Sequence, residues 1–269
     1  MAESVQSVLV PATQVAQQVA VGKAPNGVSY AVFGETSIAA SELDRMVQAV
    51  PRSIAAALTR KAYYFVPLAM SESRPDSRND AIDSPGHRGS SEPTMIASAY
   101  SADFVEHAIC HRNVPLNDVE GVFISTRLLS DRFALAFEFF INVGHAFVDA
   151  VGVPDGFTEL VWNQAIADVR GETSQDAWES RNLSLAAGPV DNKPRIDEKA
   201  KNNFIESAFS DAIAIYQLSL SVDFDYSELR EREYPLLAPQ ALAERLRLVA
   251  KLFPPNPNYE FAIRYRRRA

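Results

Sequence analysis

The stretch FFINVGHAFVDAVG, from Phe139 to Gly152, decides the predicted fold of this chain. It closes a longer run of Phe, Leu, Ala, Ile and Val, which predicts a buried helix over 130–151 with Ser130 as its N-cap. Four polar residues in this helix follow i, i+4, i+7 and i+11 spacing and therefore share one face. They are Glu138, Asn142, His145 and Asp149. Burying such groups without partners is costly, so we expect this face to meet hydrogen-bonding groups, water or a metal ion.

The rest of the chain shows helix and strand signals in turn. Hydrophobic period and capping residues predict helices over 41–61, 94–112, 203–220 and from Pro239 to the PPNP stop at 254–257. Runs rich in aromatic and β-branched residues predict strands over 62–70, 120–126 and 259–265. Pro51 is expected to interrupt the first helix, and Pro67 to end the first strand or to lie at a sheet edge.

These elements predict an α+β fold that is predominantly helical and has a small mixed sheet. A chain of 269 residues with 47% apolar side chains can bury a core of this kind. The main domain is expected over 40–222, after an N-terminal arm at 1–39 and before a C-terminal helix and terminal strand at 223–269. Two polar stretches inside it are expected to be irregular, a mobile loop at 71–93 and an excursion at 171–203.

The motif VGHAFVDAVG resembles the second half of the active-site helix of zincin metallopeptidases, particularly the family around the anthrax lethal factor, whose helix reads HExGHxxD or close to it. The order of elements is similar too, with the predicted strand at 120–126 in the place of the substrate-side edge strand. Downstream, NNFIESAF at 202–209 resembles the FxEAF-type helix that supplies a glutamate ligand. The resemblance implies a zincin-like fold over roughly residues 40 to 222.

Carried over by position, the resemblance gives His145 the role of the second histidine ligand and Glu206 that of the glutamate ligand. Ile141 stands where the first histidine should be, and Asn142 stands where the general-base glutamate should be. In the zincin mechanism two histidines and a carboxylate hold zinc, and the glutamate takes a proton from the bound water. Isoleucine cannot ligate zinc and asparagine cannot act as a base, so zinc proteolysis by the usual route is not expected.

A second histidine pair lies in EHAICHR, where His107 and His111 are four residues apart with Cys110 beside them. On a helix this is metal-ligand spacing. The alternative is a C-terminal helix turn in which imidazoles interact with the helix dipole. If this pair approaches His145 and Glu206 in space, the four residues would form a displaced metal site. The sequence otherwise predicts no cofactor, and zinc is the metal that these ligands would bind.

Charge and composition limit the classes of partner. The net charge of −8 argues against binding to nucleic acid or to an anionic membrane surface, because both require a basic field. The N-terminal residues do not resemble a secretory signal, and no apolar stretch is long enough to predict a transmembrane span. A single cysteine suits a reducing compartment, so we expect a cytoplasmic protein, although export without a signal stays open. The oligomeric state is not predicted.

Three functions are compatible with these residues. The first is a catalytically inactive zincin-like domain, a pseudo-metallopeptidase that binds a protein or peptide through the former substrate cleft or its edge strand. In this hypothesis Glu138, Asn142, His145, Asp149 and Glu206 form a hydrogen-bonded relic of the active site. The second is a metal-dependent hydrolase that uses the four possible metal ligands named above. The third is a structural or assembly protein in which the polar helix face serves packing only.

Overall fold

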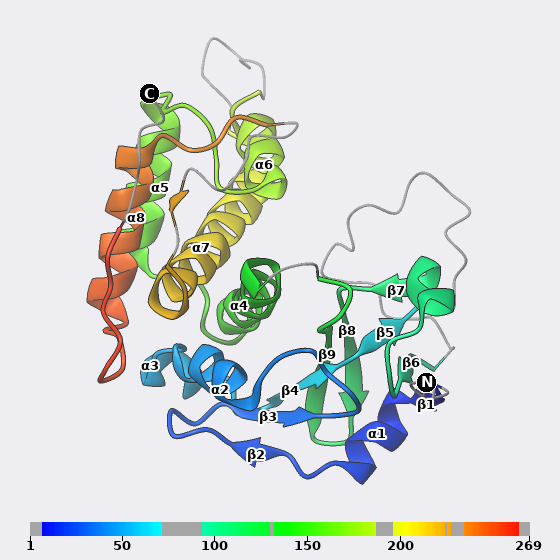
Figure 1. Cartoon of the computed structure of the whole chain (residues 1–269). Helices are drawn as coiled ribbons and strands as arrows, with labels where there is room; N and C mark the ends of the chain where they lie inside the picture. Colours follow the sequence, from blue (N-terminus) through cyan, green and yellow to red (C-terminus); the bar gives the residue numbers. More distant parts are fainter. Residues whose placement is uncertain are drawn as a thin grey trace. The chain divides into compact units, whose positions relative to one another are not determined.

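The computed structural model describes residues 7–71, 93–129, 132–186, 196–223, 225–226 and 234–263 (Figure 1). The described elements confirm an α+β fold of mainly helical content with small sheets. The chain divides into two compact units. Unit 1 comprises Met1–Asp44 and Thr59–Glu138, and unit 2 comprises Arg45–Leu58 and Phe139–Ala269. Nearly all of the predicted mobile loop, the predicted N-cap Ser130 and the end of the predicted terminal strand lie outside the described residues.

Unit 1 contains a mixed sheet, as predicted, and this sheet has five strands. Its strands, in spatial order, are β2 (Gly22–Lys23), β3 (Ser29–Val32), β4 (Lys61–Val66), β9 (Val119–Ser125) and β8 (His111–Leu116). The three inner strands β3, β4 and β9 are parallel, whereas β2 and β8 pair antiparallel at the two edges. The predicted strand at 120–126 is therefore an inner strand, and the expectation that it forms the sheet edge is wrong.

A second, antiparallel sheet completes unit 1. Its strands, in spatial order, are β1 (Leu9–Pro11), β6 (Met95–Ala97), β5 (Leu68–Met70) and β7 (Ala108–Ile109). Pro67 lies between β4 and β5, which agrees with the prediction that a strand ends at this proline. The predicted N-terminal arm contains β1, helix α1 (Ala12–Gln18), β2 and β3, so its described residues join both sheets instead of standing apart. The predicted domain boundaries otherwise stay a prediction.

One face of the five-stranded sheet packs against α1. Ala12 and Val15 of this helix lie in a buried cluster with Tyr64 of β4 and Phe123 of β9. The two aromatic rings stack with their centroids 4.5 Å apart. Gly121 of β9 lies in a crowded position, because a Cβ atom there would lie 2.6 Å from a methyl carbon of Leu116, whose side chain would have to move. The packing of this face is therefore set by close contacts between β8, β9 and β4.

The predicted helix over 94–112 is wrong. This stretch forms β6, a 3₁₀ helix at Ala102–His107, β7 and the start of β8. The apolar spacing that favoured a helix is present in the sequence, but Ile96 pairs with both Val10 and Ala69 in the second sheet. Pairing with strands that are distant in the chain therefore outweighs the helical spacing of the apolar residues.

Unit 2 is helical. It contains α3 (Arg52–Ala55), α5 (Asp155–Ile166), α6 (Gln175–Leu185), α7 (Glu198–Ser221) and α8 (Pro239–Leu252). Helices α7 and α8 confirm two predicted helices, whereas α5 was not predicted and α6 lies inside the excursion expected at 171–203. The described part of the predicted terminal strand, 259–263, is not a strand. Four phenylalanine rings pack around α7: Phe147, Phe157, Phe209 and Phe253.

Two helices cross the boundary between the units. Helix α2 (Ala40–Gln48) begins in unit 1, and helix α4 (Arg132–Val151) confirms the helix predicted from the opening motif. Helix α2 and α3 are separated at Pro51, as predicted, but the expected helix ends before residue 61, where β4 begins. Asn256 holds the turn between them, since its side-chain amide donates to the carbonyls of Gln48 and Val50.

Among the described residues, one helix is long and apolar enough to cross a membrane, by length and composition alone. It is Phe133–Val151, within α4. Half of this window is buried inside the structure, as in the core helix of a soluble protein, so the finding is weak evidence for a membrane span.

Candidate functional site

The four polar residues predicted to share a buried face of α4 have different surroundings. Asn142 is buried, with 8% of its surface exposed, whereas His145 and Asp149 are exposed. The Glu138 side chain is mostly buried and lies 2.5 Å from Nδ1 of His111. The polar face of α4 is therefore mostly buried at Glu138 and Asn142 and open to solvent at His145 and Asp149.

His145 lies where α4 approaches α7. The backbone at Gly144 packs so closely on α7 that a Cβ atom would lie 2.6 Å from the carbonyl oxygen of Ser210. The next residue on α7 is Asp211, whose carboxyl pKa is raised by burial, while the His145 imidazole acts in the opposite direction. Glu206, which the resemblance assigned, is exposed on α7.

Asp211 is a buried carboxyl without a guanidinium partner among its described contacts. Burial raises its pKa and Glu172 adds to the rise, whereas hydrogen bonds from Ser174 and Thr173 oppose it. The Thr173 hydroxyl donates to Oδ2 of Asp211 at 2.7 Å. The sequence contained a signal for this residue, because Asp211 is the single acid in the apolar run from Ala208 to Leu220.

The predicted helical histidine pair is not present. His107 ends the 3₁₀ helix and His111 begins β8, so the two imidazoles do not have the i, i+4 geometry of an α-helix. Within the parts of the chain that the structure describes, no three His, Cys, Asp or Glu side chains are grouped so that they could hold a metal ion. The ligand set His107, His111, His145 and Glu206 therefore gains no support from the described residues.

Cys110 is not poised as a nucleophile. Burial raises the pKa of its thiol, and the nearby Glu138 carboxylate raises it further. The reactive thiolate is therefore less populated than in an ordinary cysteine at the same pH. The structure therefore does not favour Cys110 as a nucleophile that a neighbouring histidine activates.

One of the two edges of the five-stranded sheet is formed by β8, which the sequence did not predict as a strand. The Ser125 amide donates to the Cys110 carbonyl at 2.8 Å, which marks residues 110 and 125 as a hydrogen-bonded pair. Bonded and non-bonded pairs alternate along an antiparallel ladder, so Arg112, Val114 and Leu116 bond to β9. The backbone groups of His111, Asn113 and Pro115 therefore point away from the sheet.

No described strand pairs with this outer edge of β8. The side chains of His111, Asn113 and Pro115 are exposed, whereas those of the alternate residues are half-buried. Pro115 has no N–H group, so the edge offers outward amide donors only at His111 and Asn113. An extended chain could add to the sheet here, over a short length that ends at Pro115.

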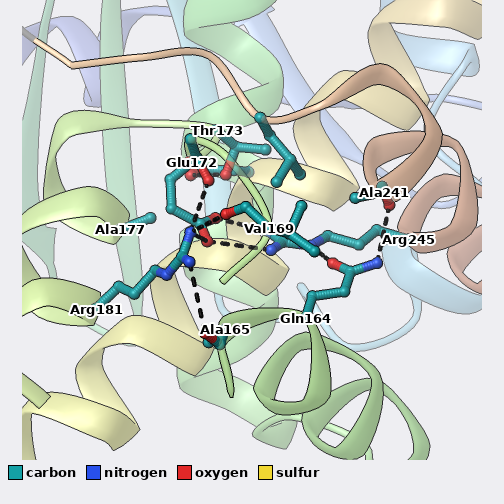
Figure 2. A network of polar contacts seen from close by, with 12 residues as sticks. Gln164, Ala165, Val169, Glu172, Thr173, Ala177, Arg181, Ala241 and Arg245 are labelled. Atoms are coloured by element: carbon teal, nitrogen blue, oxygen red, sulfur yellow. Dashed lines mark hydrogen bonds and ion pairs between the residues drawn. The ribbon is translucent and has the colours of Figure 1, made fainter. Parts of the chain in front are cut away.

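The densest polar network of unit 2 surrounds Glu172 and is shown in Figure 2. Arg245 donates from Nη1 to Oε2 of Glu172 at 2.8 Å, and Arg181 donates to Oε1 at 3.3 Å. Gln164 accepts a hydrogen bond from Nε of Arg245 at 2.8 Å. Both arginines and the glutamate are buried. Because every charge in the network has an opposite charge and further hydrogen bonds, we interpret it as a structural core and not as a reactive site.

The backbone around Glu172 explains how this charge is held inside. Glu172 donates from its amide to the Pro235 carbonyl and accepts at its own carbonyl from the Leu237 amide. Gly171 precedes it with φ +79°, and a Cβ atom there would lie 2.1 Å from the Leu236 carbonyl oxygen. Only glycine fits this close backbone approach. The sequence carries no local pattern from which this pairing of distant segments could be predicted.

The chain matches no family model and no curated protein sequence. The resemblance to zincins therefore rests on the sequence motifs at 143–152 and 202–209, and it stays a prediction.

Proposed function

We propose that the protein is a catalytically inactive, zincin-like module that binds an extended segment of a partner protein along the edge of β8. The outward-facing backbone of His111 and Asn113 carries this proposal, because such an edge binds an extended peptide through main-chain hydrogen bonds. The partner would lengthen the five-stranded sheet by one strand. Its contact with the backbone would end at Pro115, which has no amide to donate.

The residues of α4 support the absence of hydrolysis. Ile141 and Asn142 occupy the positions at which a zincin carries a metal ligand and the general base. Asn142 is also buried, and an amide cannot accept a proton from water as a carboxylate does. Peptide binding without cleavage is therefore the activity that these residues favour over a metal-dependent hydrolase.

The composition supports a protein partner in a reducing compartment. The net charge of −8 favours a polypeptide over nucleic acid or an anionic membrane, and the single cysteine is compatible with the cytoplasm.

Hydrogen exchange of the free protein tests the edge itself. We expect the amides of His111 and Asn113 to exchange rapidly, and those of Arg112 and Val114 to be protected by their bonds to β9. Protection of His111 and Asn113 in the free protein would show that the edge is already covered and would refute the proposal.

Binding is tested with peptides selected from a displayed library of random linear peptides and then synthesised. Asn113→Pro removes the outward amide donor without removing a bond to β9, whereas Asn113→Ala keeps the donor and is the matched control. We expect Asn113→Pro to weaken binding by about tenfold or more, the equivalent of ~1.4 kcal/mol, and Asn113→Ala to leave it near wild type. Equal affinity for the two variants, or cleavage of the bound peptide, would contradict the proposal.

A further inference from the structure

We infer that the segment bound by β8 is an amphipathic strand, with apolar side chains at every second residue on the side of the sheet that carries α1. This inference rests on the proposed function and specifies the chemistry of its partner. It follows from the two different faces that border the same backbone edge.

The first face is mainly apolar, and it also carries the half-buried Arg112. Val114 and Leu116 of β8, together with Ala16 and Val19 at the C-terminal end of α1, are half-buried and pack on the cluster that contains Tyr64 and Phe123. Side chains on directly opposite residues of neighbouring strands point to the same face of a sheet. Partner residues opposite Val114 and Arg112 would therefore point toward α1 and could cover the remaining apolar surface of this cluster.

The second face is polar. His111, Asn113 and Pro115 project on it and are exposed. The His111 imidazole contacts the Glu138 carboxylate at its border. Partner residues opposite these positions would lie beside the Asn113 amide and the contact between His111 and Glu138, at an exposed border of the sheet, so polar side chains fit there. The two faces together require alternation of apolar and polar residues in the partner, with a period of two.

A second copy of this chain fits the edge less well. If two β8 edges paired antiparallel about Asn113, His111 of each copy would lie opposite Pro115 of the other. The amide that residue 115 would donate does not exist, so each copy would lose a hydrogen bond at this position. In this register a foreign segment without the restriction makes the better partner, and we assign the edge to an extended segment of another protein, with self-association as an outcome of the test.

Two synthetic peptides of equal composition test the inference by fluorescence anisotropy. The first alternates threonine and valine, as in Lys-Thr-Val-Thr-Val-Thr-Val-Thr-Lys, and the second contains the same residues with the three valines adjacent. We expect the alternating peptide to bind wild-type protein about tenfold more tightly, the equivalent of ~1.4 kcal/mol. Val114→Thr keeps the β-branched shape but adds a hydroxyl on the apolar face, and should reduce this preference. Asn113→Ser changes the opposite face and should retain it.

The outcomes separate the two proposals. If both peptides bind equally and Asn113→Pro abolishes both, the edge binds peptides but the amphipathic inference is wrong. If neither peptide binds more tightly to wild-type protein than to Asn113→Pro, both proposals are refuted. If the free protein is a dimer that the alternating peptide converts to a monomer, the edge is used for self-association, and the assignment to a foreign segment is overturned.

Discussion

Single residues decide how α4 and α7 meet. Gly144 and Ser210 form the close approach between the two helices, and each is followed by a titratable residue, His145 and Asp211. The resemblance to zincins assigned His145 and Glu206 as metal ligands, and this assignment stays a prediction. In the structure Glu206 is exposed, and the buried carboxyl of Asp211 interacts electrostatically with His145.

The buried Asp211 carboxyl should make the stability of unit 2 depend on pH. Because burial raises its pKa above the ordinary value of 3.8, the folded state binds the proton more tightly than the unfolded state. The contribution to stability is then complete below this ordinary value and is lost as pH rises through the folded pKa. Asp211→Asn should remove this loss, so the variant should gain stability relative to wild type as pH increases.

Tryptophan fluorescence during urea unfolding measures this effect, because Trp162 and Trp178 both belong to unit 2. Asp149→Asn, at an exposed position of α4, is the matched control and should follow the wild-type pH profile. An unchanged pH profile in Asp211→Asn would show that the carboxyl is not destabilised by burial.

At the scale of the elements, two helical glycines offer a comparison of packing with helix propensity. Alanine is favoured over glycine inside a helix by about 1 kcal/mol. At Gly156 of α5 a Cβ atom meets nothing within 4 Å, so Gly156→Ala should stabilise the protein. At Gly144 the same atom meets the Ser210 carbonyl oxygen at 2.6 Å, so Gly144→Ala should destabilise the protein by ~1–3 kcal/mol.

The thermal unfolding midpoints of the two variants should therefore shift in opposite directions. A stabilised Gly144→Ala would contradict the close approach of α4 to α7.

The zincin resemblance of α4 can be tested by adding the missing ligand. Ile141→His would place two imidazoles at i, i+4 on this helix, the spacing that zinc sites use. We expect the variant to bind zinc measurably more tightly than wild type in competition with a chromophoric chelator. Ile141→Asn introduces a polar residue without an imidazole and serves as the control. If Ile141→His binds no more zinc than Ile141→Asn, the motif lacks the geometry that the resemblance implies.

The elements also show where the spacing of apolar residues predicts a helix correctly and where it does not. The apolar runs that became α4, α7 and α8 are long, and the periodic pattern of each agrees with its final surroundings. The run over 94–112 has an equally regular spacing, but it is divided among short strands that pair with residues far away in the chain. The spacing of apolar residues along the chain carries no information about distant pairing partners. For this reason the sequence predicts a helix up to residue 112, where the structure has the start of β8.

At the scale of the whole molecule, the sequence by itself determined the α+β class, the apolar helix α4, the break at Pro67 and the negative net charge. These properties depend on composition and on neighbours a few residues apart. Only the tertiary structure decided that β9 is an inner strand and β8 an edge strand, that the Asp211 carboxyl is buried, and that Glu172 is held by Arg181 and Arg245. The physical reason is that strand order, helix crossings and buried ion pairs join residues far apart in the chain. Their energies depend on close contacts, such as those at Gly144 and Gly171, that no local pattern reveals.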